Sequence, residues 1–428
     1  MPRPLRIAIA GLGNVGAAVV KILQQNAQPI SQRAGRAIEI TAVSARNHAR
    51  DRGIDISSYD WSDDPVALAQ RDDTDLVVEV IGGENGPAKL VIEYALAHRK
   101  HVVSANKALL ARHGQTLAEL AEAQNVALRY EAAVCGGIPI IKALTEGLAA
   151  NKITRVMGVM NGTCNYILTT MEKTGADYAH VLHDAQRLGY AEADPAFDVG
   201  GMDAAQKLAL LAAAAFGTRI DYDGIAVEGI DHISLTDIVQ ARDMGFSIKL
   251  LGLARMTNEG LEQRMQPCLV PESSPLGQLD GVTNMVVVEG DFIGQTVYRG
   301  PGAGAGPTAS AVVADIIDIA RGLIIPTFGV PAVGLSQATR ATSGVDAAYY
   351  LRFSLSDRPG ALGLIATALG NHSISINRMR QYGHDSVIAP VLIVTHATAR
   401  ANLDAALKDI AKIDVSLAPP VALRIETV

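Results

Sequence analysis

The chain has 428 residues, of which 49% are hydrophobic and 19% are charged, and its formal net charge is −7. This length supports roughly two to four folded domains, and the composition excludes a disordered chain. The acidic balance, without a run of lysine or arginine, predicts neither nucleic acid nor a membrane surface as a partner.

The three cysteines, Cys135, Cys164 and Cys268, form neither a disulfide framework nor a Cys-x-x-Cys metal motif. Such sparse cysteines are typical of a reducing compartment. The first residues run directly into a predicted strand without a signal-type apolar segment, and no apolar stretch reaches the ~20 residues of a membrane span. We therefore expect a cytoplasmic protein.

A strand is predicted at residues 5–10, followed by a glycine-rich turn and a helical pattern that runs to Leu23. Further strand-like segments follow, with helical patterns between them. Strands that alternate with helices predict a doubly wound parallel α/β sheet of the Rossmann type. We assign residues 1–135 to this dinucleotide-binding domain and expect residues 301–340 to complete it. The strand-like segments are 38–43, 76–81, 101–104 and 126–131, and the helical patterns are 65–71, 87–98 and 114–125.

The turn after the first strand has the pattern Gly-x-Gly-x-x-Gly. In such a turn the first glycine permits a tight bend, the second lets the backbone approach a pyrophosphate, and the third allows close helix packing. The following helix start offers free N–H groups to an anion. The pattern predicts a nicotinamide dinucleotide site, and a structural turn or another nucleotide is the alternative. The residues concerned are Gly11, Leu12, Gly13, Asn14, Val15 and Gly16.

The second predicted strand ends without the acidic residue that would bind the ribose of NAD. Arg46 stands near this position, with Arg50 four residues later. An arginine there would pair with a ribose 2′-phosphate. We therefore expect NADP(H) to be preferred and NAD(H) to be accepted, unless both arginines are only solvated surface charges.

The middle of the chain has a different pattern, which predicts an α+β domain for substrate binding and dimerisation over residues 136–300. The glycine-rich segment 300–306 then leads to Thr308, which we expect to cap a helix that ends at Arg321. Residues 326–344 predict a linker. The strands expected in the middle are 153–160, 250–256, 263–269, 284–290 and 291–297, and the helices are 161–171, 178–188 and 202–216.

Lys107 follows the predicted strand 101–104, at the edge where parallel α/β sheets bind their ligands. Asp203 and Lys207 share one face of a predicted helix whose next turns are apolar on all sides. Such a helix is buried, so its charged end is expected to open on a cleft, and Glu192 could join that cleft. The alternative is that these residues are surface charges and an ordinary surface ion pair.

Four motifs carry a family resemblance across nearly the whole chain. The motifs are Ser104-Ala-Asn-Lys107-Ala-Leu, Asn161-Gly-Thr163-Cys-Asn-Tyr-Ile-Leu, Gly189-Tyr-Ala-Glu192-Ala-Asp-Pro and Asp198-x-x-Gly-x-Asp203-x-x-x-Lys207. With these motifs the sequence resembles homoserine dehydrogenases, and the resemblance implies NAD(P)-dependent interconversion of L-homoserine and L-aspartate 4-semialdehyde in threonine and methionine biosynthesis.

The resemblance also implies roles for single residues. Lys207 would donate or accept the proton, and Lys107 would assist it and contact the cofactor. A lysine in a closed site near a second cation can have its pKa lowered toward the working pH, which suits a base. Substrate binding is implied for Glu192, Asp203 and Thr163, and cofactor binding for Gly189 and for Gly302 or Gly304.

The segment from Glu131 to Ile138 is a glycine-containing loop after a predicted strand. Carbonyl oxygens and a carboxylate suit a hard cation, although the residues alone favour a plain turn. The resemblance implies a sodium ion bound by Glu131 and by the carbonyl groups of Val134, Gly136 and Ile138.

Residues 349–428 show the order strand, helix, strand, strand, helix, strand, with Asp357-Arg-Pro-Gly360 at the first helix. This segment resembles a ferredoxin-like ACT domain. The resemblance implies L-threonine as an allosteric effector and pairing between subunits in a homodimer or homotetramer. A ligand-free dimerisation module is the alternative.

Two other functions fit parts of the sequence. One is a semialdehyde dehydrogenase in which Cys135 or Cys164 is the nucleophile, but no histidine stands near either cysteine in the sequence. The other is a non-catalytic sensor of NADP and an amino acid, which would not need a buried lysine for proton transfer.

Overall fold

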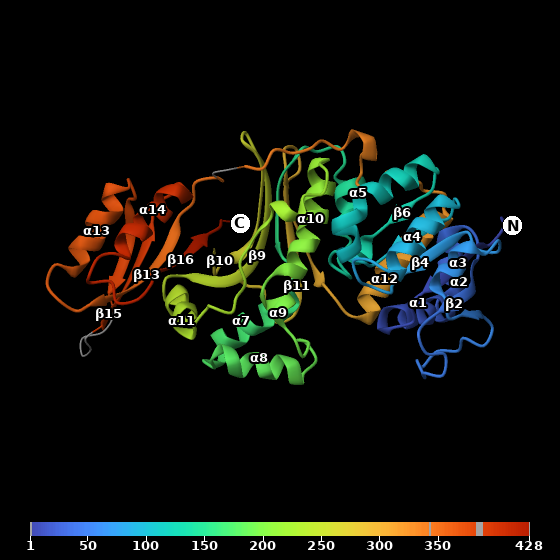
Figure 1. The fold of residues 1–428 in the computed structure, drawn as a ribbon, viewed down its shortest axis with the longest axis horizontal. Coiled ribbons are helices and arrows are strands. Elements are labelled where there is room, and N and C mark those ends of the chain that lie inside the picture. The colour runs from blue at the N-terminus through green and yellow to red at the C-terminus, as the bar shows by residue number, and fades with distance from the viewer. Residues whose placement is uncertain (1, 342–343, 382–387, 428) are drawn as a thin grey trace.

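The computed structural model describes residues 2–341, 344–381 and 388–427. Three parts follow one another along the long axis of the molecule (Figure 1). The N-terminal part, a central sheet with its helices, and the C-terminal part lie from right to left in this view. Within the described residues, no helix is both long and apolar enough to cross a membrane.

The N-terminal part is a six-stranded sheet of order β3-β2-β1-β4-β5-β6 in which all paired strands are parallel. The strand order reverses between β1 and β4, which is where such sheets form a binding crevice. The predicted doubly wound parallel sheet is confirmed. Its strands are β1 Leu5–Ala10, β2 Ile38–Ser44, β3 Asp60–Ser62, β4 Leu76–Glu79, β5 His101–Ser104 and β6 Leu128–Arg129.

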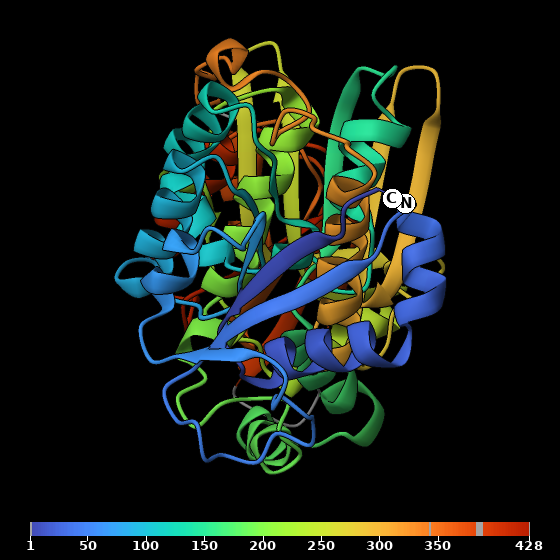
Figure 2. The same ribbon diagram turned by 90° about the vertical axis from the view of Figure 1, so that its right-hand side faces the viewer.

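Helices cover both faces of this sheet because its strands are buried and apolar on both sides (Figure 2). One face packs against α3, α4 and α5, and the other against α1, α2 and α12, which returns from late in the chain. Their bounds are α1 Asn14–Gln25, α2 Ala27–Ala34, α3 Pro65–Gln70, α4 Pro87–Ala97, α5 Lys107–Ala123 and α12 Ala305–Ala320.

Two predicted helix starts are wrong. Helix α5 begins at Lys107, seven residues before the predicted segment, because the side chain of Asn106 caps it by accepting a hydrogen bond from Leu109 N at 3.1 Å. Helix α12 begins after Gly304, whose φ of +113° permits the turn, so Thr308 is not the cap. The N–H of Thr308 already donates to the Gly304 carbonyl within the first turn, at 3.0 Å.

The central part is a mixed sheet with strands in the order β12-β11-β7-β9-β10, and β8 pairs with β10. The predicted α+β pattern is confirmed, although β12 starts three residues later than expected because residues 291–293 form the hairpin turn. The strands are β7 Ile153–Val159, β8 Ala226–Val227, β9 Phe246–Thr257, β10 Gly260–Pro271, β11 Thr283–Gly290 and β12 Gly294–Pro301.

Helix α10 is the buried centre of this part. All residues from Asp203 to Ala213 are buried, and the helix packs against β7 and β9 on one side and α5 on the other. Helix α11 was not predicted. The helices of this part are α6 Ile140–Lys142, α7 Gly162–Thr174, α8 Tyr178–Arg187, α9 Ala196–Val199, α10 Met202–Phe216 and α11 Leu235–Asp243, and four short turns of other helix types are η1 Glu131–Ala133, η2 Ala143–Gly147, η3 Tyr222–Gly224 and η4 Ala332–Gly334.

The C-terminal part has the predicted ferredoxin-like order, with strands β16-β13-β15-β14 and two helices that pack together. Strand β16 also pairs in parallel with β10, through Cys268 with Arg424 and Leu269 with Ile425. The C-terminal sheet therefore continues the central one. The elements are β13 Tyr349–Ser356, α13 Ala361–Asn371, β14 Ile376–Gln381, β15 Ile388–Thr395, α14 Arg400–Ile410 and β16 Val421–Ile425.

Candidate active site

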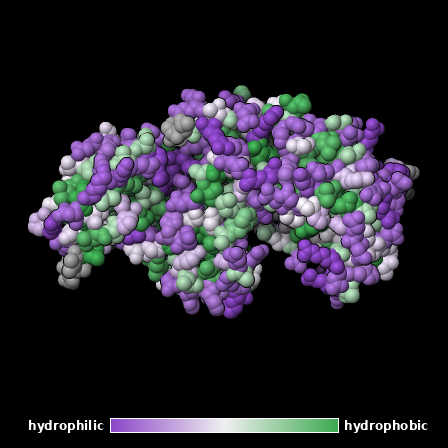
Figure 3. All heavy atoms as spheres, in the orientation of Figure 1, coloured by the Kyte–Doolittle hydropathy of each residue, from purple (hydrophilic) through white to green (hydrophobic). Residues whose placement is uncertain are grey.

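A cavity of about 1040 Å³ lies between the parallel sheet and the central part. Figure 3 shows the surface hollowed between these two parts of the molecule. The carboxyl ends of β4 and β5 open on the cavity, as expected for this type of sheet. Both parts line it, with Val15, residues 80–82, 105–107, 132–134, 161–163 and 189–192, Asp198, Asp203, Lys207, residues 282–284 and 299–304, and Thr308.

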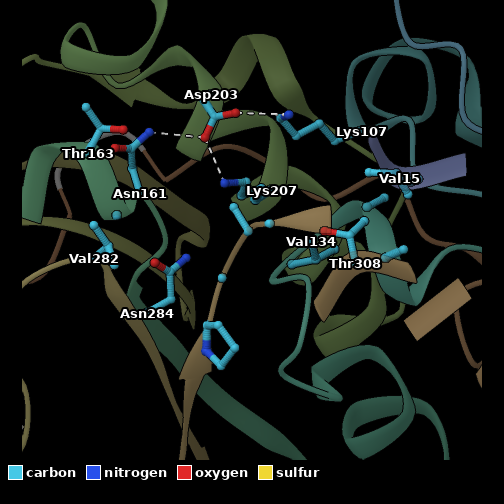
Figure 4. A pocket seen from close by; sticks show the side chains of 18 of the residues that line it. Val15, Lys107, Val134, Asn161, Thr163, Asp203, Lys207, Val282, Asn284 and Thr308 are labelled. Carbon is cyan, nitrogen blue, oxygen red and sulfur yellow. Dashed lines mark hydrogen bonds and ion pairs between the residues drawn. The ribbon is translucent and has the colours of Figure 1, made fainter. Parts of the chain in front are cut away.

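Two lysines share one carboxylate at the centre of the cavity (Figure 4). Lys207 Nζ lies 2.7 Å from Asp203 Oδ2 and 2.8 Å from the carbonyl oxygen of Met160. Lys107 Nζ, at the start of α5, lies 3.0 Å from Asp203 Oδ1. The structure thus brings Lys107 to Asp203 and Lys207, which lie much later in the sequence, and it buries Asp203 and Lys207.

The charges of this cluster set each other's protonation. Burial raises the pKa of Asp203, but Lys207 and Lys107 together outweigh burial and hold that pKa well below its usual range. Burial lowers the pKa of Lys207, but the attraction of Asp203 outweighs it and the pKa of Lys207 is raised. The expectation of a lowered lysine pKa is therefore wrong, because Lys207 contacts a carboxylate directly.

Asn161 and Asp198 belong to the same cluster and were not singled out from the sequence. Asn161 caps α7 by accepting from Cys164 N at 2.8 Å, and its Nδ2 lies 3.0 Å from Asp198 Oδ1 and 3.2 Å from Asp203 Oδ2. Burial raises the pKa of Asp198, and the charge of Asp203 adds to that effect. The available signal was the N-cap pattern of Asn161 at a helix start.

The three remaining residues with an implied role near the substrate line the same cavity. Thr163 Oγ1 donates to the carbonyl oxygen of Tyr190 at 2.6 Å, which ties the start of α7 to the loop after α8. Glu192 is exposed on that loop, and Gly189 begins it with a φ of +76°. The loop therefore places one acidic side chain at the mouth of the cavity.

The glycine loop fits a dinucleotide. A Cβ atom at Gly11 would lie 2.6 Å from the Val80 carbonyl oxygen, and one at Gly16 would lie 1.9 Å from the Gly11 carbonyl oxygen, whereas Gly13 faces open space. The α1 N-cap, Gly13, makes no side-chain capping bond, so the first N–H groups of the helix remain available. Gly304 offers the same arrangement at α12, and of these glycines it is the one that lines the cavity.

Arginines gather near the glycine loop. Arg46 and Arg50 are exposed just beyond the end of β2. Arg52, which the sequence analysis missed, donates from Nε to the Leu12 carbonyl oxygen at 3.0 Å, a contact that no local pattern signals. Three arginines therefore stand on the segment that follows β2, and one of them bonds the glycine loop.

In the loop that the resemblance predicts to bind sodium, the carboxylate of Glu131 already accepts hydrogen bonds from the protein. Glu131 accepts from Ile141 N at 2.9 Å and from Lys142 N at 2.8 Å, and burial followed by the charge of Asp315 raises its pKa to about 7. The buried carbonyl oxygens of Val134 and Gly136 accept no hydrogen bond from the described residues. Two free carbonyl oxygens suit a hard cation better than the Glu131 side chain does.

Within the described ranges, no group of three His, Cys, Asp or Glu side chains could hold a metal ion. The Ile138 carbonyl oxygen accepts from Ile140 N at 2.8 Å and keeps a second lone pair. Carbonyl ligation is therefore the arrangement that these residues fit.

The cysteines are not suited to nucleophilic catalysis. Cys135, Cys164 and Cys268 are free and buried. Burial raises the pKa of the Cys135 thiol to about 11, and it raises that of Cys164 as well. A nucleophile must be a thiolate near neutral pH, so neither thiol is activated.

A parallel dinucleotide-type sheet that faces a buried lysine–aspartate cluster across one cavity defines an oxidoreductase that acts on a CH–OH group with a nicotinamide cofactor. The family models that match are "Homoserine dehydrogenase, NAD binding domain" over residues 11–131, "Homoserine dehydrogenase" over 139–317 and "ACT domain" over 349–415. The chain belongs to the homoserine dehydrogenase family.

Relatives match over the full length. The homoserine dehydrogenase of Neisseria gonorrhoeae is 44% identical over 434 residues, and the alignment covers 99% of each chain. The crystal structure of a homoserine dehydrogenase from Thiobacillus denitrificans has a TM-score of 0.94 at 40% identity and 99% coverage of each chain. The Staphylococcus aureus homoserine dehydrogenase structure at pH 7.5 has a TM-score of 0.79 at 30% identity and 100% coverage. The cysteine-dependent dehydrogenase and the non-catalytic sensor are not supported.

Proposed function

We propose that Lys207 transfers the proton in the interconversion of L-homoserine and L-aspartate 4-semialdehyde. The observation that carries this role is the position of Lys207 Nζ, which is buried in the cavity wall and lies 2.7 Å from Asp203 Oδ2. An ammonium has three N–H donors, and Asp203 and Met160 take two of them. The third is left for the substrate oxygen, which it polarises and protonates during reduction of the aldehyde.

Lys107 and Asp203 support this step. Asp203 binds one lysine with each carboxylate oxygen, so it fixes the distance between the two ammonium groups. Lys107 is about a third exposed and faces the cavity, where it assists Lys207 and reaches the cofactor. Glu192, Asp203 and Thr163 bind the amino-acid part of the substrate, with the two carboxylates attracting its ammonium group.

Residues of both glycine turns hold the cofactor, which supplies or accepts the hydride when bound. Gly13 and the free N–H groups of α1 receive its pyrophosphate, and Arg46 pairs with a ribose 2′-phosphate. NADP(H) is therefore preferred, and NAD(H) is accepted. The cofactor-binding set is Gly11, Leu12, Gly13, Asn14, Val15, Gly16, Arg46, Lys107, Gly189 and Gly304.

A sodium ion binds in the loop after β6, next to η1. Its ligands are the carbonyl oxygens of Val134, Gly136 and Ile138 together with the main chain of Glu131, since the Glu131 carboxylate already accepts two N–H groups. The ion holds this loop against the turn that precedes α12. That contact is close, because Gly137 N donates to the Pro301 carbonyl oxygen at 2.9 Å.

For the domain boundaries and the regulation we propose what the sequence predicts. Residues 1–135 with 301–340 bind the cofactor, residues 136–300 bind the substrate and form the dimer, and residues 349–428 form the ACT domain. L-threonine binds the ACT domain as effector in a homodimer or homotetramer. Three free, buried cysteines suit a reducing compartment such as the cytoplasm.

The test is an assay of the purified protein with aspartate 4-semialdehyde and each reduced cofactor. We expect oxidation of NADPH with a higher kcat/KM than that of NADH. A higher kcat/KM for NADH than for NADPH would contradict the proposed role of Arg46, but it would not affect the proposed role of Lys207. L-threonine is added in a parallel series, and a change in neither activity nor melting temperature would contradict the effector.

A further inference from the structure

The side-chain amide of Asn284 stands in the wall of the active-site cavity without a full set of partners. Asn284 is the second residue of β11, is 1% exposed and is one of the labelled cavity residues in Figure 4. Its Oδ1 is buried and accepts no hydrogen bond within the described part of the chain. A buried acceptor without a partner is unfavourable, so its presence in the wall of a functional cavity points to a donor on a ligand.

The surroundings of this amide place it between the reacting centre and the late glycine turn. A Cβ atom at Gly302 would lie 1.9 Å from Asn284 Nδ2, so the amide rests flat on the main chain of that glycine. Asn284 and Lys207 both line the cavity, and both lie near the buried thiol of Cys135. The amide therefore belongs to the same region of the cavity wall as the proposed proton-transfer group.

We infer that the Asn284 amide binds the carboxamide of the nicotinamide ring, an inference that rests on the cofactor role proposed above. The carboxamide carries an NH2 donor group and a carbonyl acceptor, as an asparagine amide does, so the two groups are complementary. It is attached to the ring carbon next to the one that exchanges hydride. Asn284 lines the same cavity as Lys207, so its side chain is placed to meet this group once rotation about the last side-chain bond turns Oδ1 toward the cavity.

Asn165 provides a matched comparison. It is also buried, and its Oδ1 also lacks a partner, but its Nδ2 donates to the carbonyl oxygens of Leu279 at 3.2 Å and Gly281 at 2.8 Å. Asn165 lies outside the lining of the cavity. Its role is to hold the loop before β11. Replacing Asn165 therefore serves as the control for an effect on the fold alone, without an effect on cofactor recognition.

The experiment measures Kd by calorimetry for Asn284→Ala, Asn165→Ala and the unchanged protein with three probes. These are NADP+, its 3-acetylpyridine analogue, in which a methyl group replaces the carboxamide NH2, and 2′,5′-ADP, which lacks the nicotinamide half. We expect Asn284→Ala to weaken NADP+ about 2- to 10-fold, the range of one hydrogen bond, and to leave 2′,5′-ADP within about twofold. The preference, which is the Kd of the analogue divided by the Kd of NADP+, should fall toward one in this variant.

Asn165→Ala lowers the melting temperature and keeps the preference of the unchanged protein. An unchanged preference in Asn284→Ala would overturn the inference, as would an equal loss of 2′,5′-ADP binding. A higher KM for homoserine with an unchanged Kd for NADP+ would also overturn it, by assigning the amide to the substrate.

If Asn284→Ala does not fold, Asn284→Asp keeps the size and the acceptor oxygen and is expected to keep the preference. Loss of the preference in this variant would contradict the inference. NAD+ and its 3-acetylpyridine analogue are measured in parallel. If the protein does not prefer NADP+, this second pair still tests whether Asn284 binds the carboxamide.

Discussion

Two groups of charges in this molecule each lie in the wall of a cavity and differ in the cations that they contain. At the active site, Lys107 and Lys207 share the single carboxylate of Asp203 at the edge of a large cavity. At the junction of β10 and β16, Arg264 and Arg424 both bond Glu426, at 2.8 and 2.6 Å. Glu262 also pairs with Arg264, so the junction contains two cations and two carboxylates.

The difference lies in the kind of cation and in what its donors contact. At the junction, planar guanidinium groups bond Glu262 on β10 and Glu426 just after β16, and their fork geometry favours a fixed arrangement of the two strands. At the active site, the two lysines and Asp203 lie near a second acid, Asp198, and two of the three N–H donors of Lys207 have a partner among the described residues. The remaining donor can bind a developing alkoxide, whereas the guanidinium pairs join two parts of the fold.

The largest expected effect separates the two groups most sharply. Replacing Lys207 by Met removes the proposed proton donor, so kcat should fall about 10²- to 10⁴-fold in both directions. Binding of NADPH, measured by fluorescence titration, should change little. Turnover within a few-fold of normal would remove Lys207 from proton transfer.

The corresponding change at the junction should affect stability. Arg424→Met leaves Glu426 with half of its compensation, and removing one partner of a buried pair costs about 3–5 kcal/mol. We expect a lower melting temperature with kcat within a few-fold of normal. Arg424→Met combined with Glu426→Gln should recover part of the loss. A large fall in kcat at an unchanged melting temperature would contradict the distinction between the two groups.

The sequence predicted those features that have a local pattern. The parallel sheet follows from apolar strands that alternate with helices, and the sharing of one helix face by Asp203 and Lys207 follows from their spacing of four. The position of Lys107 after a strand predicted its side of the cavity. These predictions needed only the periodicity of helices and strands.

Features that depend on contacts between distant segments were not predictable in this way. The pairing of β10 with β16, the two carboxylates bonded by Asn161, and the amide of Asn284 against Gly302 leave no trace in neighbouring residues. The direction of the Lys207 pKa shift was mistaken for the same reason. It depends on the 2.7 Å contact with Asp203, which outweighs burial.

A smaller effect tests how the active-site group sets its protonation. Asp203 raises the pKa of Lys207, so Asp203→Asn should lower that pKa, because an opposite charge is lost. Homoserine oxidation needs the neutral lysine, and its rate therefore rises with pH through that pKa. The midpoint of kcat against pH, at saturating homoserine, should move to lower pH in the variant. Glu262→Gln at the junction should leave the midpoint unchanged, and an unmoved midpoint in Asp203→Asn would assign the titration to another group.

The smallest effect concerns a charge that belongs to neither buried group. Arg46 is exposed at the outer end of the crevice, where solvent screens its interactions, in contrast to the buried Lys207. Arg46→Ala should lower the ratio of kcat/KM for NADPH to that for NADH about tenfold, near the lower limit for charge-assisted hydrogen bonds of ~1.5–3 kcal/mol. Arg50→Ala serves as the matched control, and the kcat/KM for NADH should stay constant in both variants. Because the interaction is screened, the ratio in the unchanged protein should also fall as salt is added. A ratio that is insensitive to both Arg46→Ala and salt would place the 2′-phosphate elsewhere, and Arg52, whose Nε already bonds the glycine loop, would be the next residue to replace.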